Sequence, residues 1–170
     1  MSVRVLGIDP GSRRTGWGVV DLEGSRLRRF RSGVIRADGS DLAERLARVH
    51  RDISEVIALC RPDSAALESV FTHRNPRSAI LLGHARGVAL AACGLAGLHA
   101  AEYAPAHVKL AVSGYGRADK AQVQQMVQRL LRLDVLPGPD EADALAVSIC
   151  HSLERRSSAA VALAQRERRA

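Results

Sequence analysis

The sequence feature that most constrains the fold lies near the N-terminus. Residues 3–18 read VRVLGIDPGSRRTGWG, and the apolar run over residues 3–8 is typical of a short strand buried on both faces. Asp9 ends this run, and Pro10-Gly11 turns the chain away. A carboxylate at the end of a buried strand costs free energy unless a cation compensates its charge. Asp9 therefore either starts a turn or belongs to a site for a cation.

The composition favours a single domain that binds a polyanion. The 170 residues suit one domain, and a hydrophobic content of 46% with 3% aromatics predicts an aliphatic core. The net charge of +7 and the pI near 10.3 indicate nucleic acid before a membrane. We find no apolar span of about 20 residues and no signal-peptide pattern, so we expect a soluble, cytoplasmic protein with no membrane partner.

Apolar periodicity and turn residues divide the chain into strands and helices. Strands are expected over residues 3–8, 15–22, 26–35, 64–70 and 99–103. Helices are expected over residues 41–60, 76–93, 105–112, 120–131 and 139–153, and residues 71–77 have the composition of a loop. A mixed sheet with helices on its faces accounts for this order, so the expected fold class is α/β.

The helix expected over residues 76–93 carries a ridge without bulky side chains. Ala79, Gly83, Gly87 and Ala91 are four residues apart and form this ridge. Glycine inside a helix costs about 1 kcal/mol relative to alanine, so a packing reason is expected. Either the sheet beneath or a second helix in a dimer can approach such a ridge, and the pattern does not choose between them.

The third expected strand is rich in arginine, at positions 26, 28, 29 and 31. Such a row can bind nucleic acid. Charged residues also protect the edge of a sheet from aggregation, and the sequence favours this second reason. Both interpretations stay open.

Three further acids indicate that Asp9 is not alone. Glu68 lies late in a short apolar run, and Asp140 and Asp143 are neighbours on one helix face. Acids also favour the first turn of a helix, which is the simpler reason for Asp140. This topology can gather all four carboxylates at one sheet edge, and an acidic pocket in a basic protein calls for Mg²⁺ or Mn²⁺. Two such ions can activate a water and stabilise the leaving oxygen of a phosphodiester, which indicates a nuclease.

The chain has two lysines, Lys109 and Lys120, and the second has an unusual position. Lys120 is expected at the first position of a helix, where a cation opposes the helix macrodipole. The position becomes favourable if the helix start and Lys120 together receive a phosphate. A solvated surface lysine is the alternative.

Five segments give the chain a specific resemblance to a known family. In chain order they are GIDPGSRRTGWG, LESVF, LLGHARGVAL, VKLAVSGYGRADKAQVQQMV and DEADALAVSICH. Together they resemble the RuvC family of bacterial Holliday junction resolvases over residues 3–151. The first segment alone would be weak, because actin-like ATPases also begin with a strand, Asp and Gly.

The resemblance implies a ribonuclease H-like fold, with a five-stranded mixed sheet and helices on both faces. The nuclease domain would span residues 1–154, followed over residues 155–170 by a basic C-terminal tail that can be disordered. The family resemblance further implies a homodimer that resolves four-way DNA junctions in recombination and DNA repair by symmetric phosphodiester hydrolysis. It implies two Mg²⁺ ions, with Mn²⁺ as a substitute, and a branch-migration complex, RuvA-RuvB, as partner.

The same match of motifs implies roles for particular residues. The metal-binding catalytic carboxylates would be Asp9, Glu68, Asp140 and Asp143. Lys109 and Lys120 match lysines near the scissile phosphates, with Lys120 also catalytic, and Phe71 matches an aromatic residue that can stack on an unpaired base at the junction centre. The ridge helix matches the segment through which family dimers associate.

Two alternatives of other classes remain. A non-catalytic junction-binding protein would need the basic surface and the dimer but not four acids. An actin-like ATPase would need a second phosphate loop and normally a longer chain.

Overall fold

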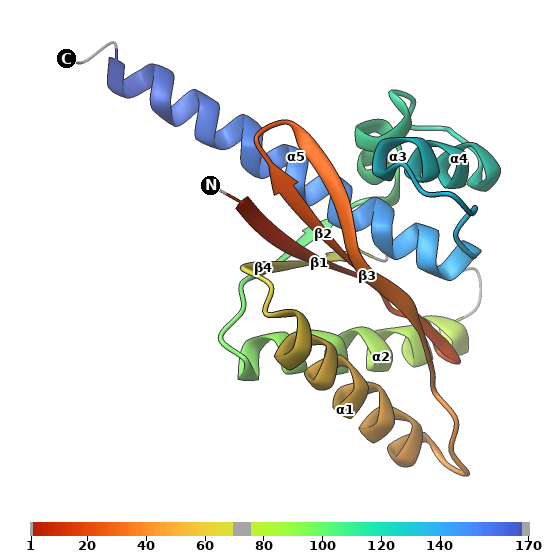
Figure 1. The fold of residues 1–170 in the computed structure, drawn as a ribbon. Helices are drawn as coiled ribbons and strands as arrows, with labels where there is room; N and C mark the ends of the chain where they lie inside the picture. Colours follow the sequence, from red (N-terminus) through yellow and green to blue (C-terminus); the bar gives the residue numbers. More distant parts are fainter. Residues whose placement is uncertain (1, 70–75, 168–170) are drawn as a thin grey trace.

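The computed structural model describes residues 2–69 and 76–167, and their side chains as far as residue 160 except residue 159. Its elements are β1 (Ser2–Asp9), β2 (Arg14–Glu23), β3 (Arg26–Arg36), α1 (Leu42–Cys60), β4 (Ser64–Glu68), α2 (Pro76–Leu95), β5 (Ala100–Tyr103), α3 (Pro105–Ser113), α4 (Lys120–Leu131) and α5 (Pro139–Glu167). The strands form one sheet of order β3-β2-β1-β4-β5. Helices α1 and α2 cover one face, and α3, α4 and α5 cover the other (Figure 1). The expected α/β fold with a mixed five-stranded sheet is confirmed.

The first strand, β1, lies in the middle of the sheet. It pairs antiparallel with β2 and parallel with β4. β5 extends the parallel half, and β3 forms the antiparallel edge. Val5, Leu6 and Ile8 are fully buried, as expected for a strand covered on both faces. Asp9 therefore stands at the end of the central strand.

Three glycines let α5 lie directly against the sheet. Gly7 and Gly18 face each other across the β1–β2 pair, and Gly16 faces Asp9 at the end of the same pair. A Cβ at Gly7 would stand 2.2 Å from the carbonyl oxygen of Ala144, and one at Gly16 would stand 2.0 Å from that of Asp140. The backbone of α5 thus occupies the space that side chains would need.

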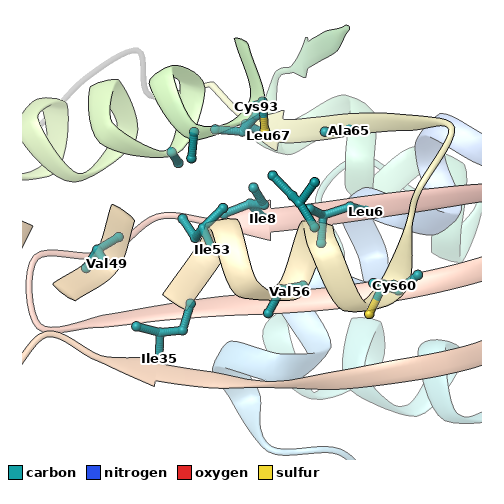
Figure 2. Packing of buried hydrophobic residues seen from close by; sticks show 14 of the residues in the cluster. Leu6, Ile8, Ile35, Val49, Ile53, Val56, Cys60, Ala65, Leu67 and Cys93 are labelled. Atoms are coloured by element: carbon teal, nitrogen blue, oxygen red, sulfur yellow. The ribbon is translucent and has the colours of Figure 1, made fainter. Parts of the chain in front are cut away.

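Two aliphatic clusters hold the helices to the two faces of the sheet. The cluster in Figure 2 includes Ile8 of β1, Ile53 of α1 and Cys93 of α2. The other cluster places Val127 of α4 and Leu145 of α5 against the opposite face. The expected aliphatic core is therefore present on both sides of the sheet.

Capping residues explain where two helices begin. Asp41 accepts a hydrogen bond from the backbone N–H of Glu44 at the start of α1. Asp119 and Gln122 form a complete capping box at the start of α4. Lys120 is therefore the first residue of α4, as the sequence pattern predicts.

Helix α5 is longer than the sequence pattern predicts. The expected helix ended at residue 153 and residues 155–170 were set apart as a tail, whereas α5 continues to Glu167. Arg155 donates a hydrogen bond to the hydroxyl of Ser64 at 2.9 Å, so the start of that segment contacts the sheet. The segment contains no glycine or proline before residue 168, and alanine-rich sequence continues a helix readily. A separate role for residues 155–170 stays a prediction.

The ridge of small residues on α2 points away from the rest of the described chain. Gly83 and Gly87 are exposed, and a Cβ at either position would meet no atom within 4 Å. The inward face of α2 is instead formed by Ala85, Ala89 and Cys93. The sheet is therefore not the partner of this ridge.

Helix α2 corrects one expectation about the chain. Among the described residues it is the one helix long and apolar enough to cross a membrane by length and composition, with a mean hydropathy of 1.4. The expectation that no such apolar span exists is therefore wrong. However, the inward face of α2 packs into the cluster shared with α1, and Arg86 at its centre forms an ion pair with Glu102 of β5. The helix is a layer of the folded domain in this structure.

Candidate active site

The ends of two parallel strands place the first two acids at one edge of the sheet. Ile8 of β1 pairs with Leu67 of β4. Asp9 and Glu68 are the next residues of these strands, so they end side by side. A cleft of about 280 Å³ opens there, and both acids line it.

Helices α3, α4 and α5 form the other walls of this cleft. Its lining consists of Asp9, Glu68, Pro105, Val108, Lys109, Lys120, Val123, Asp143 and Ala146. Because α5 lies on the glycines of β1 and β2, its second turn brings Asp143 to the end of β1. Three acids and both lysines of the chain therefore meet in one cleft, although they come from five different elements.

Lys120 is paired with one of these acids. Its Nζ donates a hydrogen bond to Oδ2 of Asp143 at 2.9 Å. This hydrogen bond raises the pKa of Lys120, which keeps the side chain charged at neutral pH. The lysine side chain is 76% exposed, so its ammonium group remains accessible from solvent.

Burial and repulsion from neighbouring acids raise the pKa of two acids of the cleft, Asp9 and Glu68. Burial raises the pKa of Asp9 to about 7, and the charges of Asp143 and Glu68 add to the shift. Burial, followed by the charge of Asp143, also raises the pKa of Glu68. Crowded carboxylates gain from a bound cation, and oxygen ligands suit hard ions such as Mg²⁺ and Mn²⁺. In charge and donor chemistry, the residues of the cleft fit a divalent metal.

We expect the carboxyl group of Asp9 to make the metal-free protein less stable as the pH rises from about 4 to about 7. The pKa of Asp9 is about 7 in the folded protein and 3.8 in the unfolded chain, so the unfolded chain releases this proton first. Unfolding is thus favoured as the pH rises, by at most about 4 kcal/mol.

Denaturant titrations with a metal chelator, at about pH 5 and about pH 8, measure this effect in the protein and in Asp9→Asn. The variant should lose this part of the pH dependence. If the variant shows the same loss of stability at the higher pH, the raised pKa of Asp9 is not its cause.

Asp140 stands apart from the other expected acids. It does not line the cleft, and its Oδ2 lies 3.8 Å from Nη1 of Arg14. Its charge still contributes to the raised pKa of Asp9. Over residues 2–69 and 76–167, no group of three or more His, Cys, Asp and Glu side chains is arranged to hold a metal ion. Asp143 and Asp140 each face a cation of the protein instead, and the four-carboxylate metal site stays a prediction.

The structure places one of the two remaining expected residues. Lys109 of α3 lines the cleft. Phe71 lies outside the residues that the structure describes.

Ion pairs around the start of α5 were not expected from the sequence. Glu141 accepts a hydrogen bond from Ser32 and lies 3.6 Å from Arg29, both on β3. Arg14 of β2 lies beside Asp140 in the same helical turn. These contacts tie the first turn of α5 to the β2–β3 edge. The partners are more than 100 residues apart, so only the charges themselves were visible in the sequence.

An acidic cleft at the end of the central strands of a five-stranded mixed sheet is the arrangement expected of a nuclease with a ribonuclease H-like fold. The family described as RuvC, crossover junction endodeoxyribonuclease, matches residues 5–151. The chain therefore belongs to the RuvC family.

Curated relatives of the same family are similar over most of their length. A crossover junction endodeoxyribonuclease RuvC of Halorhodospira halophila is 54% identical over 153 residues, which is 89% of this chain and 91% of the relative. One of Herminiimonas arsenicoxydans is 52% identical over 88% of this chain and 83% of the relative.

Solved structures support the same assignment. Thermus thermophilus RuvC is 35% identical with a TM-score of 0.84, covering 92% of this chain and 97% of that one. The T. thermophilus RuvC structure in complex with a Holliday junction substrate is 36% identical with a TM-score of 0.86, covering 92% and 96%. The yeast mitochondrial Holliday junction resolvase, at 12% identity and a TM-score of 0.66, shares the fold.

Proposed function

We propose that this protein is a structure-selective endonuclease that resolves Holliday junctions by symmetric hydrolysis of two DNA strands, in recombination and DNA repair. The observation that carries the proposal is the cleft in which Asp9, Glu68 and Asp143 meet Lys109 and Lys120. The junction substrate bound by the similar T. thermophilus protein supports four-way DNA as the substrate. A non-catalytic binding protein leaves the acids unexplained, and the relatives do not support an actin-like ATPase.

The carboxylates would hold the metal. Asp9, Glu68, Asp140 and Asp143 are the residues we propose for two Mg²⁺ ions, with Mn²⁺ as a substitute. When bound, such ions activate water and stabilise negative charge on the phosphodiester. The pairing of Asp143 with Lys120, and of Asp140 with Arg14, shows that both acids already attract cations.

The lysines and Phe71 would act on the DNA itself. The exposed ammonium group of Lys120, at the N-terminus of α4, can stabilise the charge that develops on the scissile phosphate. Lys109, on the neighbouring wall, binds a phosphate of the same strand. Phe71 stacks on an unpaired base at the junction centre. Hydrolysis leaves a 5′-phosphate and a 3′-hydroxyl.

A synthetic four-way junction incubated with the protein and Mg²⁺, beside a linear duplex built from the same arm sequences, tests this proposal. We expect nicks at symmetric positions in two opposed strands of the junction, which DNA ligase can seal. Equal cutting of the linear duplex, or an uncut junction, would overturn the proposed function.

We further propose that two copies associate through the ridge of α2. Gly83, Gly87 and Ala91 form an exposed strip on which a second helix can approach closely. The apolar side chains of Ile80 and Leu95 are 60% and 80% exposed on the same helix. A two-fold dimer supplies the two active sites that symmetric cutting needs. The branch-migration complex RuvA-RuvB is the proposed protein partner, in the cytoplasm.

The double variant Gly83→Gln, Gly87→Gln should be a monomer, because the added side chains block close approach of a second helix. Cutting of the junction should fall about tenfold or more. Light scattering coupled to size exclusion gives the mass. The matched control is Ala43→Gln, Ala47→Gln, two exposed positions four apart on α1. If the α2 variant keeps the mass and activity of this control, the dimer does not form through the ridge.

A further inference from the structure

An arginine-rich surface lies at the far end of α4 from the catalytic cleft. Two hollows of about 260 and 290 Å³ open between the start of β3 and the end of α4. Arg26 and Arg132 line both hollows, and Arg28 and Arg29 also line the first. We call these four residues the arginine surface.

Three of these arginines have no ionic partner in the described part of the chain. Arg29 lies 3.6 Å from Glu141. No described carboxylate lies within ion-pair distance of Arg26, Arg28 or Arg132, and all three are exposed. Like charges around shared hollows repel one another, so this surface gains from a polyanion.

Ion pairs connect the arginine surface to the first turn of α5, which lies next to the catalytic cleft. Arg29 belongs to the surface and also pairs with Glu141 in the first turn of α5. In that same turn Arg14 pairs with Asp140, whose charge reaches Asp9. Arg29 and Arg14 therefore join the side of the sheet that carries the arginine surface to the first turn of α5, one turn before Asp143.

The length of helix α4 gives the distance between the catalytic cleft and the arginine surface. Lys120 begins the helix in the cleft, and Arg132 follows its last residue at the hollows. Its 12 residues span about 18 Å at about 1.5 Å per residue. This length corresponds to about five base pairs of duplex at about 3.4 Å each.

We propose that the arginine surface binds backbone phosphates of one junction arm, about five base pairs from the scissile phosphate. Guanidinium groups suit phosphate oxygens, and Arg26 and Arg132 line both hollows. A duplex is stiff over this length, so an arm that leaves the cleft along α4 reaches the surface without bending. The inference rests on the proposed function only for the identity of the substrate as DNA. It gives the arginines of β3 a role beyond protection of the sheet edge.

The test is junction binding without divalent metal, so that cutting does not interfere. The test variant is Arg26→Gln, Arg28→Gln, Arg132→Asn; asparagine suits the left-handed backbone of Arg132, whose φ is 52°. The matched control is Arg48→Gln, Arg51→Gln, Arg61→Asn on the α1 side of the sheet. Arg61 is also a left-handed helix C-cap, with a φ of 49°. Both variants therefore lose three positive charges, one of them at a left-handed helix C-cap, and of these six arginines Arg48 alone pairs with a described carboxylate, Asp52 at 4.0 Å.

We expect the test variant to bind the junction at least about tenfold more weakly than the control, with the slope of log K against log salt smaller by about two to three. Neutral methylphosphonates placed about four to seven base pairs from the crossover should weaken junction binding by the unchanged protein and by the control variant, but not by the test variant. Equal binding by both variants, or equal sensitivity of both to the methylphosphonates, would overturn the proposal. The outcome does not depend on whether the protein cuts the junction.

Discussion

Asp9→Asn should bind a four-way junction as the unchanged protein does, and its rate of cutting should be lower by a factor of about 1000 or more. The residue ends the central strand, is largely buried, and has a pKa of about 7 because burial and the charges of three other acids, Asp143, Glu68 and Asp140, oppose its charge. Asparagine keeps the shape of the side chain but removes the charge that would attract a metal. The acids are a group, so the loss of one should remove most of the rate.

Gel-shift binding without metal and single-turnover cutting with Mg²⁺ separate the two effects. Asp134→Asn is the control, because Asp134 is an exposed acid in the loop after α4 and does not line the cleft. If the Asp9 variant cuts at the rate of this control, the assignment of the cleft as the active site is wrong. A variant that loses binding as strongly as cutting would show that Asp9 supports DNA binding instead.

Gly7→Ala should be the most destabilising small substitution considered for this chain. Its Cβ would stand 2.2 Å from the carbonyl oxygen of Ala144 and 2.6 Å from the backbone nitrogen of Ser148. Backbone atoms of α5 cannot turn aside as a flexible side chain can, so the helix must move away from the sheet. We expect a loss of about 3 kcal/mol or more in the free energy of unfolding.

Denaturant unfolding of Gly7→Ala beside Gly138→Ala measures this effect. Gly138 lies just before α5, is exposed and has no atom within 4 Å of a new Cβ, so alanine there should leave the fold intact and change the free energy of unfolding by less than about 1 kcal/mol. Equal stability of the two variants would contradict the close packing of α5 on β1. If Gly7→Ala fails to fold, Gly18→Ala gives a second measurement, because its Cβ would meet the side chain of Leu145 at 2.7 Å and a backbone atom, Cα of Leu145, only at 3.1 Å.

Local patterns were sufficient for most of the fold. The apolar run before Asp9, the capping box of Asp119 and the alternation of strands and helices each depend on residues close in the chain, so they can be read directly. The end of α5 was missed because polar, alanine-rich sequence fits both a tail and a helix. The apolar character of α2 was missed because alanine and glycine make up much of this helix, so it has no long run of large apolar side chains although its mean hydropathy is high.

The sequence by itself determined the strand ends that carry Asp9 and Glu68, the helix start at Lys120, and the family resemblance that the comparisons confirm. Only the tertiary structure decided that α5 lies on glycines of β1 and β2, which brings Asp143 into the cleft while Asp140 turns to Arg14. It also decided that the small ridge of α2 is exposed. The physical reason is the same in each case: these outcomes depend on which surfaces pack together across long separations in the chain, and residue spacing describes only neighbours within one element.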